Sequence, residues 1–196
     1  FISSRKARRP SASAVRNASV RRNENPGTLI YRASFAGEPG KGSRGFYDWS
    51  SGKVNPVRGG ITGAYPGKGK VAQALEVFAS KDNFSGFGSG LKPIPAGTKK
   101  LIVTGRVLRS ADYTGNTPML FFWFEKKGQK GGKPFFYRVP QGKNGVWQEF
   151  RFECSGKNFP ADKDGFILNM TSQILSKGVK TGGSIFYKDI KIYAGK

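Results

Sequence analysis

Short runs of alternating hydrophobic and polar residues make up much of this chain, which is the pattern of β-strands with one buried face. The clearest case is VWQEFRFEC at residues 146–154, where one face carries Val146, Phe150, Phe152 and Cys154. The opposite face of this segment carries a tryptophan and three charged side chains. We therefore predict a strand that packs its first face on a core.

Eight segments of this kind predict an all-β fold. They cover residues 28–35, 71–79, 99–109, 119–125, 134–139, 146–154, 166–171 and 185–193. The segment VAQALEVFA (71–79) also has helical propensity, but its β-branched and aromatic end favours a strand. Turn-forming residues separate the segments and no strand–helix alternation is present, so the pattern predicts a two-sheet sandwich.

Two segments carry further expectations. The continuous apolar run MLFFWFE at 119–125 is typical of a central strand of a sandwich. In IFYKDIKIY at 185–193, we expect Phe186, Ile190 and Ile192 to share one face.

Two stretches lie outside this pattern. Residues 1–25 are rich in Arg, Ser and Ala and almost free of acids, so they predict an extended basic arm. Residues 37–69 are rich in glycine and predict a long loop, which in a compact domain is usually functional or bound to a partner. The predicted organisation is therefore an arm at 1–25 and one β-sandwich at 26–196.

The charge of the chain adds most to the prediction of its partners. The chain has 34 Lys and Arg against 12 Asp and Glu, a net charge of +22. The first 24 residues contribute +6, and the other 172 contribute +16. A body that is itself this basic repels itself unless a large acidic partner compensates.

Several function classes lose support from composition alone. The chain has no histidine, which removes the commonest general base and metal ligand, so we expect a non-catalytic protein without a metal site. A single cysteine excludes an internal disulfide. No apolar run approaches the roughly 20 residues of a membrane span, so we expect no membrane insertion.

The arm and the loop supply the candidate partner-binding residues. Cations in the arm would neutralise phosphates or carboxylates, unless the arm is only a solvated tail or a transit-peptide remnant. Aromatic and arginine side chains in the loop are typical of interface hot spots and of stacking on a sugar or base, unless they only cover the end of the sandwich. The candidates are Arg5, Lys6, Arg8, Arg9, Arg16, Arg21, Arg22, Arg44, Phe46, Tyr47, Trp49, Arg58 and Tyr65.

Cys154 has two interpretations. Its place on the apolar face of a strand favours a small buried hydrophobic side chain. The alternative is a thioether attachment point for a bilin chromophore, which the predicted interior position disfavours.

The last hundred residues resemble a known family. The strand LIVTGRVL is followed by LFFWFE, by WQEFRFE after an Asn-Gly turn, by FILNM, and by the closing FYKDIKIY. This order resembles the jelly roll of carbohydrate-binding modules, the galactose-binding-like sandwich. Trp147 and the run Tyr187–Asp189–Ile190 occupy the places of the family's tryptophan and its closing strand. The resemblance implies a jelly-roll β-sandwich, although such modules are usually neutral or acidic.

In character the chain also resembles a red-algal phycobilisome linker of the chitin-binding-domain type, since it is basic, glycine-rich and aromatic-rich. Phe1 resembles the phenylalanine that marks plastid-targeting sequences of the red-algal type. The resemblance implies a non-catalytic linker that binds acidic phycobiliprotein discs in a light-harvesting phycobilisome. It also implies a plastid location at the stromal face of the thylakoid membrane, no covalently bound cofactor, and contact between its aromatic residues and the partner's bilins.

Two other functions stay open. A single-jelly-roll viral capsid protein would use the arm to bind RNA or DNA, but it explains the basic body less well. A polysaccharide-binding module would suit the fold, and an acidic polysaccharide would also be attracted to the charge.

Overall fold

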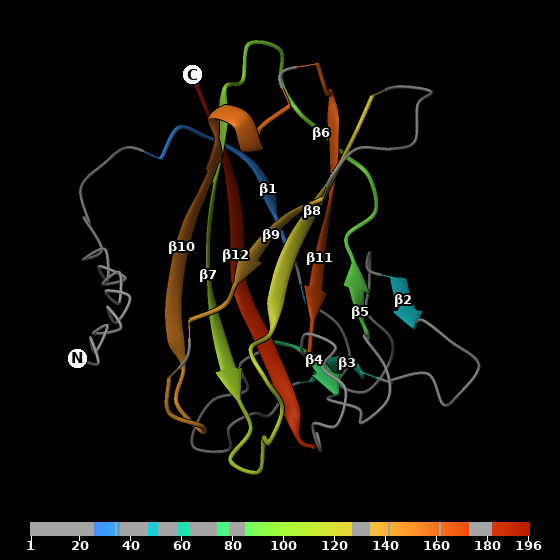
Figure 1. The fold of residues 1–196 in the computed structure, drawn as a ribbon, viewed down its shortest axis with the longest axis vertical. Helices are drawn as coiled ribbons and strands as arrows, with labels where there is room; N and C mark the ends of the chain where they lie inside the picture. Colours follow the sequence, from blue (N-terminus) through green and yellow to red (C-terminus); the bar gives the residue numbers. More distant parts are fainter. Residues whose placement is uncertain are drawn as a thin grey trace, which may run out of the picture.

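Two antiparallel β-sheets pack face to face in the computed structural model, which confirms the predicted all-β jelly-roll sandwich (Figure 1). The structure describes residues 26–33, 35, 47–50, 59–62, 74–78, 85–126, 134–140, 142–160, 162–172 and 182–196. Within this part of the chain, no helix is long and apolar enough to cross a membrane.

Sheet A has the strand order β10-β7-β12-β4-β3, with β1 paired to β12 as well. Its strands are β1 (Thr28–Arg32), β3 (Gly59–Thr62), β4 (Ala74–Phe78), β7 (Lys100–Arg109), β10 (Gln148–Ser155) and β12 (Ser184–Gly195). The long strands β7 and β12 run side by side through its middle (Figure 1).

Sheet B has the order β2-β5-β11-β8-β9, with β6 paired to β11. Its strands are β2 (Tyr47–Ser50), β5 (Ser85–Gly88), β6 (Lys92–Pro93), β8 (Met119–Glu125), β9 (Phe135–Arg138) and β11 (Gly165–Thr171). A short 3-10 helix, η1 (Gly156–Asn158), follows β10.

All eight predicted strands are present, but the prediction of one long loop at 37–69 is wrong. This stretch contains β2 and β3, whose sequences YDWS and GGIT give little local strand signal. Each becomes a strand because it pairs with a neighbour, β2 with β5 and β3 with β4. Strands β5 and β6 were also missed, since SGFG and KP are rich in residues that strands disfavour.

The core lies between the sheets and is strongly aromatic. From sheet B, Phe122 meets Phe166 edge-on with ring centroids 5.4 Å apart. From the two edge strands, Tyr137 stacks on Phe152 at 4.0 Å. Phe150, Phe152 and Cys154 are buried as predicted.

Val146 was wrongly placed on this buried face. Strand β10 begins at Gln148, and Val146 lies before it with 48% of its surface exposed. The preceding turn uses Gly145 at φ +78°, a conformation that glycine adopts readily, and the alternating pattern starts only after it.

Two buried tyrosine hydroxyls tie the end of β11 to the rest of the sandwich. Tyr187 of β12 donates a hydrogen bond to the Thr171 carbonyl oxygen at 2.6 Å, and Tyr113 donates to the Ser172 carbonyl oxygen at 2.7 Å. Burial raises the pKa of Tyr187 well above its ordinary value, so this hydroxyl stays protonated and able to donate.

Replacing Tyr187 with Phe should destabilise the fold by about 1–2 kcal/mol, because the buried Thr171 carbonyl loses its donor. The matched control is Tyr193→Phe, whose partly exposed hydroxyl makes no hydrogen bond in the described structure; it should change stability by less than about 0.5 kcal/mol. Urea unfolding of both variants measures the difference, and equal midpoints would contradict this role for Tyr187.

Candidate functional site

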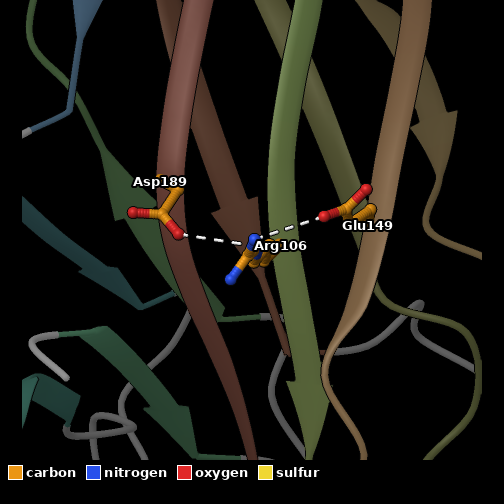
Figure 2. Close-up of polar contacts among 3 residues, drawn as sticks. All are labelled: Arg106, Glu149 and Asp189. Carbon is orange, nitrogen blue, oxygen red and sulfur yellow. Dashed lines mark hydrogen bonds and ion pairs between the residues drawn. The ribbon is translucent and has the colours of Figure 1, made fainter. Parts of the chain in front are cut away.

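The outer faces of the two sheets differ in chemistry, and both are candidates for binding. The outer face of sheet A is charged and centres on Arg106 of β7. Figure 2 shows the Arg106 guanidinium between the carboxylates of Glu149 on β10 and Asp189 on β12. The Nη2–Oε1 distance to Glu149 is 3.2 Å, and the Nε–Oδ2 distance to Asp189 is 3.7 Å. All three side chains are exposed, so these ion pairs order the surface more than they stabilise the fold.

A hollow of about 290 Å³ surrounds this ion-pair group. It is lined by Thr104, Gly105, Arg106, Glu149, Phe150, Arg151, Asp189 and Lys191. Six of these eight residues are polar or charged, so the hollow offers several groups that can hydrogen-bond a hydrophilic ligand.

A β-bulge in β12 places Asp189 at this hollow. The pairing of β12 with β7 shifts register between Lys188 and Lys191. Alone among the described non-glycine residues, Asp189 has a positive φ, of 55°. The extra residue lets both Tyr187 and Ile190 point into the core, which a regular strand could not do.

The bulge also overturns the prediction that Phe186 shares a face with Ile190 and Ile192. The two isoleucines lie in the main core, whereas Phe186 packs on the outer face of sheet A with Ala74 and Leu108. Side chains of β12 alternate between its two faces both before and after Asp189, but the alternation shifts by one residue at the bulge.

Trp147 covers this small outer cluster. It packs against the buried Ala74, Leu108 and Phe186, and the Lys188 ammonium lies 4.1 Å from its ring centroid. Because its ring contacts both the cluster and the Lys188 cation, Trp147 is already engaged within sheet A.

The outer face of sheet B is aromatic, and we call it the aromatic face. Trp123 of β8 is 39% exposed and Phe136 of β9 is 50% exposed. Phe121 lies beside Phe136, with ring centroids 5.4 Å apart. The apolar run of β8 thus forms a central strand as predicted, but Phe121 and Trp123 face outward, and Trp123 is exposed.

The strand register continues from Phe121 across sheet B to β2, through positions that are buried. Phe121 pairs with Asn169, Asn169 with Gly88, and Gly88 with Tyr47, so these positions form one cross-strand row. Trp49 pairs with Gly86 in a neighbouring row. Two predicted partner-binding positions therefore share a sheet with the exposed Trp123.

A second hollow, of about 580 Å³, opens beside the aromatic face at the edge of the sandwich. It is lined by Phe124, Pro134, Phe135, Phe136, Lys157, Asn158, Pro160 and Lys163. Phe136 belongs to both the hollow and the aromatic face, so the two surfaces are continuous.

Solved structures with a similar fold include several carbohydrate-binding modules. The family 11 module from Clostridium thermocellum, in complex with a β-1,3-1,4-mixed-linked tetrasaccharide, aligns over 85% of this chain and 96% of its own, with a TM-score of 0.53 and 13% identity. This chain shares the jelly-roll β-sandwich fold of these modules. At this identity the likeness establishes the fold alone.

The same fold also occurs in structures described as enzymes. A cyclase from Fischerella sp. TAU aligns over 86% of this chain and 97% of its own, with a TM-score of 0.60 and 10% identity. The enzymatically active domain of tailspike protein 4 from bacteriophage CBA120 has a TM-score of 0.55 and 10% identity, aligning over 83% of this chain but only 20% of its own. The expected lack of catalysis therefore stays a prediction.

No protein-family model matches the chain, and no curated protein matches it in sequence.

Most predicted partner-binding residues lie outside the described residues. These are Arg5, Lys6, Arg8, Arg9, Arg16, Arg21, Arg22, Arg44, Phe46, Arg58 and Tyr65, while Tyr47 and Trp49 are described only by their backbone. Sequence reasoning missed Trp123, Phe136 and the Arg106 group. Alternation within β10 did place Glu149 outward, but its ion pair with β7 required the register of the sheet.

Cys154 lies inside the core. Its thiol donates a hydrogen bond to the Asn158 carbonyl oxygen, with an Sγ–O distance of 3.1 Å. Burial, and then the charge of Glu153, raise its pKa to about 12. This position suits a small buried side chain and keeps the thiol from attacking a bilin.

Among the described residues, no three His, Cys, Asp or Glu side chains gather in a way that could hold a metal.

The Asp189 bulge predicts a difference between two substitutions. Asp189→Ala should be about 1 kcal/mol less stable than Asp189→Gly, because alanine pays the steric cost of positive φ and glycine does not. The control Glu149→Ala removes the other ion pair of Arg106 and should change stability by less than about 0.5 kcal/mol. Urea unfolding compares the three, and equal stability of the two Asp189 variants would contradict a strained bulge.

Cys154 predicts slow thiol labelling. At pH 8 the folded protein should resist a disulfide reagent that modifies the urea-unfolded chain completely, as followed by absorbance. Because the folded pKa is raised from 9.0 to about 12, the associated stability is present below pH 9 and is lost as the pH rises toward 12. Rapid labelling of the folded protein at pH 8 would refute the buried assignment.

Proposed function

We propose that this chain is a polysaccharide-binding module that contacts sugar through the aromatic face of sheet B. The observation that carries the proposal is the outward exposure of Trp123 and Phe136 on two adjacent strands. Large aromatic side chains exposed together on a soluble protein mark a binding surface. Here they stand on a hydrogen-bonded sheet, so they are held in place before a ligand arrives.

The chemistry of this face suits a carbohydrate. Aromatic rings present a negative π-face, on which the weakly positive C–H groups of a sugar ring can pack. Asn169 lies in the same cross-strand row as Phe121 but is only 2% exposed, whereas Arg138 of β9 is exposed two residues from Phe136 on the same strand. Polar groups beside stacking rings are the combination that orients a hydroxyl-rich ligand.

The similar solved structures support the carbohydrate class without specifying the sugar. Those described as carbohydrate-binding include xylan-binding modules and the family 11 module in complex with its mixed-linked tetrasaccharide. The net charge of +22 favours an acidic polysaccharide among the possible targets.

The phycobilisome-linker hypothesis and its plastid location rest on charge and composition alone. The similar structures reported above do not support them. The capsid alternative rests on residues 1–25, which lie outside the described residues.

Binding should depend on the exposed rings. Trp123→Ala and Phe136→Ala should each weaken retention on the polysaccharide that the parent protein binds by about tenfold, since one stacked ring contributes about 1–3 kcal/mol. The matched control is Val146→Ala, which removes an equally exposed apolar side chain from a turn away from this face. Affinity electrophoresis in gels containing xylan, mixed-linkage β-glucan, chitin or alginate at 0.3–0.5 M NaCl, about the range in which surface charge is screened, measures the effect. Absence of retention in every gel, or equal retention of all variants, would refute the proposal.

A further inference from the structure

A cationic row crosses the outer face of sheet A, on the opposite side of the sandwich from the aromatic face. Arg32 of β1 pairs with Lys191 of β12, Lys191 with Thr104 of β7, and Thr104 with Arg151 of β10. Residues that pair directly across antiparallel strands point to the same face. The row spans three strand spacings, or about 14 Å.

The carboxylates on this face are engaged by other cations. Glu149 and Asp189 pair with Arg106, and Glu153 pairs with Lys100 at 3.6 Å. Among the described contacts, none pairs the charged groups of Arg32, Lys191 or Arg151. Within the described residues, the row therefore holds three positive charges that make no ion pair, beside the already paired carboxylates of Glu149, Glu153 and Asp189.

The like charges in this row should lower the stability of sheet A. Arg32 and Lys191 lie directly opposite each other on neighbouring strands, and like charges in that position destabilise a sheet. An anionic ligand would remove the penalty. The hollow of about 290 Å³ adjoins the row, because Thr104, Arg151 and Lys191 line it. The Thr104 hydroxyl there can both donate and accept a hydrogen bond.

The neighbouring row adds a surface for the body of a sugar. Leu29 pairs with Tyr193, and Tyr193 with Ile102, one register step along the face from the cations. Leu29 is exposed and Tyr193 partly exposed, whereas Ile102 is buried. A ligand with apolar ring faces and regularly spaced negative charges matches both rows.

We propose that the cationic row is a second glycan site, which binds the carboxylate or sulfate groups of an acidic polysaccharide. The choice of a polysaccharide over another polyanion rests on the proposed function, whereas the anion site itself rests on the row. With the aromatic face on the other side, one molecule can hold two polysaccharide chains at once or gain avidity on one flexible chain.

The test distinguishes binding by the cationic row from binding that depends only on the total charge of the chain. The triple variant Arg32→Gln, Lys191→Gln, Arg151→Gln should weaken binding of the full-length protein to alginate at least tenfold at 0.15 M NaCl. It should also flatten the salt dependence of the affinity. The matched control is Lys99→Gln, Lys126→Gln, Lys143→Gln, which removes the same charge from exposed positions outside the strands of sheet A and should change alginate affinity less than threefold. Isothermal titration calorimetry measures both.

Four results make the outcome decisive. The thermal midpoint of the row variant should equal or exceed that of the parent protein, because a like-charge pair is removed. If both triple variants lose alginate binding equally, or if single-stranded DNA of matched charge binds the row as tightly as alginate, the second glycan site is refuted. Failure of Trp123→Ala to affect a neutral β-glucan would refute the aromatic face but leave the row standing, so the two proposals fail separately.

Discussion

Strand β12 is the element on which the rest of the structure depends. It pairs with β1, β4 and β7, so most of sheet A is built around it. Its inward side chains include Tyr187, Ile190 and Ile192, which pack in the core that joins the two sheets. The Tyr187 hydroxyl then bonds to the last residue of β11 in sheet B. One strand thus fixes the internal order of one sheet and its attachment to the other.

The bulge at Asp189 decides what this strand presents to the outside. Before it, Phe186 joins a small apolar cluster on the outer face. After it, Lys191 and Tyr193 take outward positions beside β7. Without the change of phase, the residues of β12 after Asp189 would exchange faces, and Lys191 would turn toward the core. The contribution of β12 to the outer face of sheet A therefore depends on one extra backbone residue.

The two outer faces give the sandwich two different binding chemistries. Sheet B exposes Trp123 and Phe136, whereas sheet A exposes cations beside the Arg106 group. Because the sheets pack against each other through an aromatic core, the faces lie on opposite sides and cannot merge into one site. A fold shared with carbohydrate-binding modules does not by itself assign either face, since function depends on the side chains that each face carries.

The sequence by itself determined the all-β class, the positions of eight strands and the buried side of β10, because period two is a local property of the chain. Charge counting also predicted an acidic partner, although not its identity. Only the tertiary structure decided that β2, β3, β5 and β6 are strands, since weak local signals become strands when a neighbour supplies hydrogen bonds. It likewise decided that Trp123 faces outward and that Arg32, Lys191 and Arg151 form one row. Those three residues are far apart in the chain, and register across strands is a property of the sheet that no single segment encodes.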